Sequence, residues 1–308
     1  MEFRVKFRGI RGSYPTPKAT HLKYGGNTAC VEVNVRNRLI ILDAGTGIIE
    51  LGENLTREHI LSGNSTDERE PINATVILSH IHQDHIQGLP FFSPAFIKTT
   101  NLEIYGPDTN KDKLKDTLSL LLFDKGFPVS LEEIQGTLNI HSFSQRNILV
   151  IKENNEHILV NSSEFNNYKK EEEDIIISAY KTTAHPKNGC LCIKISYGDK
   201  TLVYATDKEC YVGSDKKFIE FAYGCDVLIH DAQYTHQDYI SPVMPRQGYG
   251  HSTFNMAIET AKLAKAKKLY FFHYDPNYDD NILDMLDKDF QNMTVDFDFS
   301  KENLEIAL

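Results

Sequence analysis

The sequence lacks the features of a membrane protein and of an exported one. No run of roughly 18 or more apolar residues occurs in the 308-residue chain, so we expect no transmembrane helix. Residues 2–8 alternate polar and apolar side chains, which predicts a strand rather than a signal peptide. The expected location is therefore the cytoplasm, with no membrane partner.

Cysteine is sparse, and none of the five cysteines belongs to a Cys-x-x-Cys pair. An odd number without close pairs argues against a disulfide framework and against a cysteine-based metal site. We expect buried, reduced thiols at Cys30, Cys190, Cys192, Cys210 and Cys225.

An excess of positive charge is also missing, because 33 Lys and Arg face 43 Asp and Glu, giving a net charge of −10. A protein that binds long nucleic acid through its phosphates is normally basic, so this balance makes such a partner unexpected. The charge balance does not argue against a small phosphorylated ligand. The polar segment 56–71 is expected to be a surface loop or a frayed helix. Segment 164–174 is expected to be a surface loop and is a candidate dimer arm, which leaves a homodimer open.

No composition shift or linker divides the chain, which favours one α/β domain over residues 1–308. Apolar runs predict strands followed by helices, twice over. Among the expected helices are 48–55, 111–122 and 253–265.

Metal-type ligands are densest directly after the β-branched run 74–79. His80, His82, Asp84 and His85 stand within six residues, and imidazole and carboxylate are what zinc and similar divalent ions bind. Their spacing fits no pair of ligands one helical turn apart, so we place them on a loop at a strand end.

Further candidate ligands stand where other predicted strands end. Asp43, His185, Asp207, His230-Asp231 and His273 each follow or close such a run. Side chains at the ends of neighbouring strands converge on one edge of a sheet. Seven donors then make a complete set for two ions, which together can hold a hydroxide and clamp a phosphoryl or acyl oxygen. The set is His80, His82, Asp84, His85, His185, Asp207 and His273, with Asp207 as the natural bridge.

These motifs, in this order, resemble those of the metallo-β-lactamase superfamily of hydrolases across essentially the whole chain. The resemblance implies a four-layer αβ/βα sandwich of two mixed β-sheets flanked by helices. It implies that His80, His82 and His185 hold one divalent ion and that Asp84, His85 and His273 hold the other. It further implies a bridging Asp207, an Asp43 that orients ligands, and zinc as the metal, with manganese or iron as alternatives.

Two later blocks resemble ribonuclease Z, the tRNA 3′-end endonuclease of this superfamily. They are His230-Asp231-Ala232 and Gly250-His251-Ser252-Thr253. They imply a phosphodiesterase in which His251 contacts the phosphate or protonates the leaving oxygen, while Asp231 pairs with His251 and raises its pKa. The helix start at Thr253 is expected to offer backbone N–H groups to an anion.

The first part of the chain is similar to bacterial phosphodiesterases of the superfamily related to cyclic-nucleotide enzymes. The resemblance rests on Arg11-Gly-Ser-Tyr-Pro-Thr-Pro, Tyr24-Gly-Gly-Asn-Thr and Leu-Asp43-Ala-Gly-Thr-Gly47. The chain has no long Gly/Pro-rich arm of the kind that ribonuclease Z uses to grip tRNA. This favours a compact substrate.

The leading hypothesis is therefore a di-metal phosphodiesterase acting on a small cyclic phosphodiester, such as a 3′,5′-cyclic nucleotide, by attack of a metal-bridging hydroxide. Asp84 and Asp231 assist, and His251 aids the leaving group. Phe127 and Tyr249 are candidates for base stacking, and Arg246 for a second charged group. The alternatives are a ribonuclease Z-type RNA endonuclease and a non-catalytic metal- or ligand-binding member of the fold.

Overall fold

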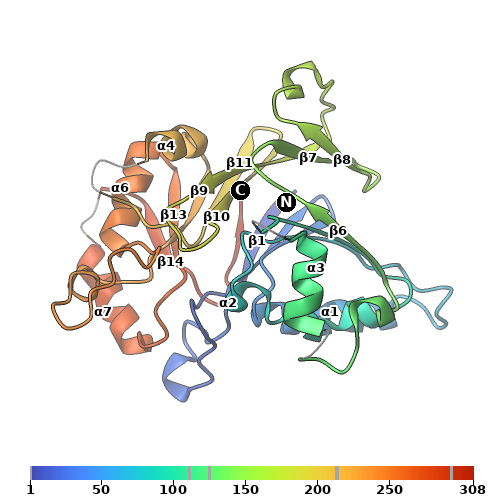
Figure 1. Cartoon of the computed structure of the whole chain (residues 1–308), viewed down its shortest axis with the longest axis horizontal. Helices are drawn as coiled ribbons and strands as arrows, with labels where there is room; N and C mark the ends of the chain where they lie inside the picture. The colour runs from blue at the N-terminus through green and yellow to red at the C-terminus, as the bar shows by residue number, and fades with distance from the viewer. Residues whose placement is uncertain (1, 110–111, 124–125, 212–214, 292–293) are drawn as a thin grey trace.

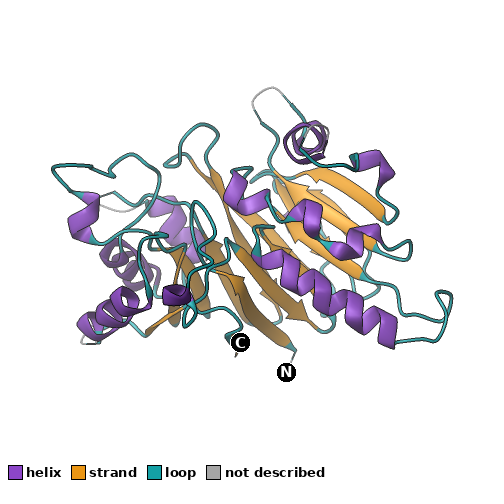
Figure 2. Cartoon of the chain, turned by 90° about the horizontal axis from the view of Figure 1, so that it is seen from below, coloured by secondary structure: helices purple, strands orange, loops and turns teal. Residues whose placement is uncertain are grey.

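Two mixed β-sheets face each other, and helices cover the outer side of each (Figure 1). The structure is a computed structural model that describes residues 2–109, 112–123, 126–211, 215–291 and 294–308. Figure 2 shows helices on either side of the strands, seen from below. The αβ/βα sandwich predicted from the sequence motifs is confirmed, while the single domain over residues 1–308 stays a prediction.

The first sheet has the strand order β15-β1-β2-β3-β4-β5-β6. Its strands β3 to β6 run parallel, and the pairs on the other side of β3 are antiparallel. The bounds are β1 Phe3–Gly9, β2 Cys30–Val35, β3 Arg38–Leu42, β4 Asn73–Ile77, β5 Asn101–Gly106, β6 Thr137–Ser142 and β15 Glu305–Ala307.

The second sheet has the order β14-β13-β12-β11-β10-β9-β7-β8. Here β11 to β14 run parallel, and the remaining pairs are antiparallel. The bounds are β7 Asn147–Ile151, β8 His157–Asn161, β9 Ile175–Thr182, β10 Cys190–Tyr197, β11 Lys200–Ala205, β12 Val227–Asp231, β13 Lys268–Phe272 and β14 Phe297–Phe299.

The helices divide between the two sheets: α1 packs on β1 and β2, and α3 on β6, whereas α6 packs on β12 and β13 (Figure 1). No helix in the described part of the chain is long and apolar enough to cross a membrane. The bounds are α1 Gly47–Leu61, α2 Gln83–Ile86, α3 Leu114–Leu118, α4 Lys216–Ala222, α5 His236–Tyr239, α6 Phe254–Ala264 and α7 Asp280–Phe290.

Two predicted helices have different limits in the structure. The helix expected over 48–55 runs to Leu61, so the first part of segment 56–71 is not a loop. Its last turn is anchored because His59 is buried and its Nδ1 lies 2.7 Å from the Glu70 carbonyl oxygen. The helix expected over 111–122 begins at Leu114, where Asp108 accepts the backbone N–H, and widens into a π-type turn over Ser119–Phe123. The start expected at residue 111 lies outside the described residues.

The main core lies between the sheets and is aromatic at its centre. Phe7 on β1 is fully buried, and its ring centroid lies 5.4 Å from that of Tyr270 and 6.3 Å from that of Phe272, both on β13. A second apolar cluster fills the space between the first sheet and α1. All five cysteines are buried and free, as predicted.

Three strands end in residues with a left-handed backbone. Asp43 directly follows β3, Asp207 stands two residues after β11 and His273 directly follows β13, with φ values of 61°, 47° and 65°. Asp and His enter this region more readily than most residues. The reversal turns the chain at the strand end, and all three side chains are buried at the same edge of the molecule.

Removing the Phe7 ring tests how far the two sheets depend on this core. We expect Phe7→Ala to lower the free energy of unfolding by about 3–5 kcal/mol, because a buried ring is replaced by a cavity. Urea denaturation followed by circular dichroism measures the change. The matched control is Phe91→Ala, since Phe91 is 56% exposed. Equal losses in the two variants would contradict the packing described here.

Candidate metal centre and acid–base site

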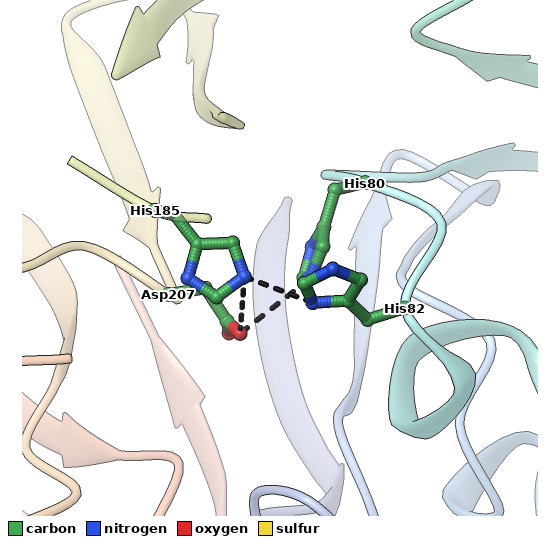
Figure 3. A group of neighbouring side chains, drawn as sticks. All are labelled: His80, His82, His185 and Asp207. Carbon is green, nitrogen blue, oxygen red and sulfur yellow. Dashed lines mark hydrogen bonds and ion pairs between the residues drawn. The ribbon is translucent and has the colours of Figure 1, made fainter. Parts of the chain in front are cut away.

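Seven histidine and aspartate side chains from both sheets converge at this edge. One group of donor atoms comes from His80, His82, His185 and Asp207, and the atoms all lie within 4.8 Å of one another. Figure 3 shows His185 and Asp207 approaching from one side, and His80 and His82 from the other. Asp84, His85 and His273 form a second group within the same limit. The structure therefore brings together every residue that the sequence predicted as a ligand.

Asp207 stands between the two groups. Its Oδ2 lies 3.5 Å from His80 Nε2 and 3.6 Å from His185 Nε2. Its Oδ1 lies 3.1 Å from both His85 Nε2 and His273 Nε2. One carboxylate oxygen thus faces each group, which is the geometry that a bridging ligand needs.

The local structure of the ligand-rich segment differs from the expected loop. His80 and His82 do lie in the loop after β4, but Asp84 and His85 belong to the short helix α2. His82 is the helix N-cap residue with extended backbone, and the His85 N–H donates to its carbonyl oxygen. The helical turn after an extended residue sends these ligands toward two different positions.

Asp43 forms a hydrogen bond with His85, a member of the second group. Its Oδ2 accepts hydrogen bonds from His85 Nδ1 and Tyr204 Oη, each at 2.8 Å. Ser79 donates to the same carboxylate through its N–H at 2.7 Å and its hydroxyl at 2.8 Å. With Nδ1 held in this way, His85 presents Nε2 to the site. The position of Asp43 agrees with an orienting role, but the sequence did not point to Ser79 or Tyr204.

The loop after β1 forms another wall of the site. The Ser13 N–H donates to Asp84 Oδ2 at 2.7 Å, and Ser13 Oγ accepts from Gln233 Nε2 at 3.0 Å. A Cβ atom on Gly12 would lie 2.5 Å from the His273 ring, so only glycine fits there. The Arg11-Gly-Ser motif was noted in the sequence, but these contacts between distant segments could not be read from it.

His251 lies beside the cluster rather than within the two main groups. Its Nδ1 is 2.9 Å from Asp231 Oδ2, and its Nε2 is 4.0 Å from Asp207 Oδ2. Its ring stacks on that of His273 at 5.1 Å. Burial favours the neutral ring, but Asp231 raises the pKa of His251 to about 9. This shift favours the protonated imidazole, which is the form that a general acid requires.

Burial and neighbouring charges shift the pKa values of the side chains in the cluster. Burial lowers the pKa of His80 well below its ordinary value and lowers that of His185 to about 4. Burial opposes ionisation of Asp84 and Asp207, but the histidines around them hold both carboxyl pKa values well below the usual range. Neutral imidazoles and ionised carboxylates are the forms that bind a divalent ion. His85 differs: burial lowers its pKa, but the surrounding carboxylates raise it well above the ordinary value.

The residues fit the two divalent ions that the fold implies. His80 Nε2 is buried and has no hydrogen-bond partner, although it points at Asp207. A buried ring nitrogen without a partner is costly unless something binds it. Five imidazoles and two carboxylates are a donor set for zinc, manganese or iron, and the set alone does not choose among them.

The three residues proposed to contact the substrate lie in two different settings. Phe127 packs among Phe91, Phe96 and Phe123, which makes it part of an aromatic cluster. Tyr249 is 48% exposed, and the Arg246 guanidinium lies over its ring at 5.8 Å. Their roles toward a substrate stay predictions.

Two of the backbone N–H groups at the start of α6, where an anion site was expected, already have partners, and the anion site stays a prediction. The Phe254 N–H donates to the Tyr234 carbonyl oxygen, and the Met256 N–H donates to Thr253 Oγ1. Thr253 therefore caps this helix.

A sandwich of this kind, with a histidine–aspartate cluster at one edge of both sheets, defines a hydrolase of the metallo-β-lactamase fold. A family model described as the Beta-lactamase superfamily domain matches residues 38–274. The chain belongs to this superfamily, as the sequence motifs predicted.

Relatives and solved structures extend the match over nearly the whole chain. A protein named ribonuclease Z from Picrophilus torridus is 28% identical and covers 98% of this chain and 95% of its own length. A metallo-β-lactamase fold protein from Bacillus subtilis superposes with a TM-score of 0.64 at 18% identity, covering 99% of both chains. The short form of human tRNase Z superposes with a TM-score of 0.60 at 18% identity, covering 99% of this chain and 98% of its own. At these identities the structures show the fold alone.

Replacing the bridging carboxylate tests the metal centre directly. We expect Asp207→Ala to reduce bound metal from two ions per chain to one or none, because both donor groups lose a ligand at once. Elemental analysis after dialysis against zinc measures the content, and circular dichroism checks the fold. The matched control is Asp298→Ala, an exposed carboxylate on β14. Unchanged metal content in Asp207→Ala would contradict the bridging geometry.

Proposed function

We propose that the chain is a metal-dependent phosphodiesterase that cleaves RNA in the manner of a ribonuclease Z endonuclease. The observation that carries the reaction class is the buried His251–Asp231 pair, held beside the bridging carboxylate of Asp207. A proton donor at this distance from a metal-type cluster suits a reaction that expels an alkoxide, as phosphodiester hydrolysis does.

The metal-type cluster and His251 would act on the two sides of a bound phosphate. Two divalent ions at the cluster would supply Lewis acidity to a phosphoryl oxygen and acidify a bound water. His251 Nε2 points toward Asp207, while Nδ1 is held by Asp231, so Nε2 is the nitrogen that delivers a proton. Asp84 is fixed by the Ser13 N–H and by His273, which keeps its carboxylate in one orientation. In this scheme His251 protonates the leaving oxygen.

RNA is the substrate class best supported by the relatives. Proteins named ribonuclease Z from several organisms match this chain at 24–28% identity over 82–98% of its length. These matches favour the RNA endonuclease over the small cyclic phosphodiester that the sequence motifs favoured. The observations at the site agree with either substrate, because both present a phosphodiester with an alkoxide leaving group.

A small cyclic phosphodiester is the second candidate, and the net charge of −10 favours it. Neutralising the phosphates of a long RNA needs a basic surface, whereas a compact substrate is held by the site alone. Arg246 lies over the buried ring of Tyr234 and the exposed ring of Tyr249, so one cation and one ring are available to a small ligand.

A substrate panel separates the two candidates. We expect zinc- or manganese-loaded protein to cleave a precursor tRNA at its 3′ trailer faster, at equal concentration, than it hydrolyses 3′,5′-cyclic AMP or cyclic GMP. Gel electrophoresis and chromatography measure the products, and Asp207→Ala is the inactive control. Turnover of the cyclic nucleotides with intact precursor tRNA would transfer the assignment to the second candidate. No cleavage of any phosphodiester would refute both.

The proton-donor role of His251 is tested with two leaving groups. We expect His251→Ala to slow cleavage of the RNA about 10²–10⁴-fold, because its leaving alkoxide must be protonated. Hydrolysis of bis(p-nitrophenyl) phosphate should change far less, since nitrophenolate leaves as an anion. Initial rates at saturating substrate provide the comparison. Equal losses on both substrates would mean that His251 does not act as the acid.

A further inference from the structure

A buried carboxylate outside the metal cluster holds the segment that carries His251. Glu209 is 1% exposed and stands two residues after Asp207. Its Oε1 accepts from Tyr239 Oη at 2.5 Å and from the Gly248 N–H at 2.7 Å. Its Oε2 accepts from the Gly250 N–H at 2.9 Å. Within the described part of the chain, no Lys, Arg or His lies within ion-pair distance of it, so these three donors stabilise its charge.

The contacts to segment 248–252 fall on alternate residues. Glu209 holds Gly248 and Gly250, and Ser252 Oγ donates to the Lys208 carbonyl oxygen at 2.5 Å. The Cys210 N–H donates to the same Ser252 Oγ at 3.1 Å. The residues between them are Tyr249, which is exposed, and His251, which faces the cluster. Residues 208–210 therefore hydrogen-bond to one side of segment 248–252, and the other side of the segment faces the site.

Position 250, where segment 248–252 lies against the metal cluster, requires glycine. Gly250 has φ +93°, and a Cβ there would lie 2.3 Å from His185 Nδ1. That close approach lets the Gly250 carbonyl oxygen sit 3.2 Å from the same nitrogen. Gly250 therefore donates its N–H to Glu209 and places its carbonyl oxygen against His185, and His251 is the next residue.

We propose that Glu209 is a positioning residue, whose carboxylate fixes segment 248–252 so that His251 stands at the leaving atom beside Asp207. The inference rests on the proposed phosphodiesterase function. It assigns to Glu209 no contact with the substrate or with a metal. Its effect on the reaction passes through His251, and this makes it distinguishable from a residue that only supports the fold.

The test compares leaving groups in Glu209→Gln. An amide keeps the size of the side chain but turns an NH₂ group toward one of the backbone N–H donors. We expect kcat for cleavage of the precursor tRNA to fall about 10- to 100-fold, as it does for other residues that orient a reacting side chain without contacting the substrate. Hydrolysis of bis(p-nitrophenyl) phosphate should fall less than about threefold, and two ions should stay bound. The matched control is Glu259→Gln, an exposed residue of α6.

The double variant Glu209→Gln/His251→Ala adds an independent readout. If Glu209 acts through His251, the double variant should cleave the RNA no more slowly than His251→Ala alone. Additive losses, equal losses on both substrates or an unchanged Glu209→Gln enzyme would each overturn the inference. If Glu209→Gln does not fold, Glu209→Asp takes its place, because the shorter carboxylate cannot span both glycines. A wild-type protein without phosphodiesterase activity would instead refute the proposed function.

Discussion

The whole site depends on one buried carboxylate that does not itself face the metal cluster. Asp43 follows β3 of the first sheet and accepts hydrogen bonds from Ser79, which follows β4, and from His85 on α2. It also accepts from Tyr204 on β11, which belongs to the second sheet. The two sheets are therefore joined by polar contacts directly beneath the ligands. Leaving any of these buried donors without an acceptor costs about 1–3 kcal/mol, so the arrangement resists the relaxation that would misalign the site.

Left-handed backbone at the strand ends explains how ligands from both sheets meet. Asp43, Asp207 and His273 each reverse the chain where a parallel strand stops. Such conformations cost about 1–3 kcal/mol apiece and persist only where the surroundings hold them. Here the surroundings are the hydrogen bonds to Asp43 and the close packing of Gly12 on the His273 ring. Strain of this kind is offset by the rigid sandwich, which holds the donor atoms of both groups close together.

The sequence predicted the parts of the site that carry recognisable chemistry. The dense run His80–His85 and the candidate ligands at strand ends identified seven side chains that the structure brings together, and the resemblance of these motifs to the superfamily implied the sandwich. Supporting residues could not be predicted, because Ser13 and Tyr204 are ordinary residues whose roles arise from contacts across about 70 and 160 positions of chain. Helix limits failed for a related reason: the end of α1 depends on the contact of His59 with Glu70, a loop residue whose position only the fold defines.

In the proposed mechanism, residues 207–210 link Asp207, the expected bridging carboxylate, to the segment that carries His251, the proposed acid. Asp207 faces both donor groups, and the next N–H, that of Lys208, donates to Asp231 Oδ2 at 3.1 Å, the same oxygen that pairs with His251. In-line displacement at phosphorus requires the attacking and leaving atoms to stand on opposite sides, so the cluster and the acid must keep a fixed separation. Independent loops would let that separation drift. A single turn begins at the left-handed Asp207 and ends where residues 208–210 contact segment 248–252. Covalent geometry and a few buried hydrogen bonds in this turn fix the separation between the cluster and His251. Asp207 and His251 therefore need not be close in sequence.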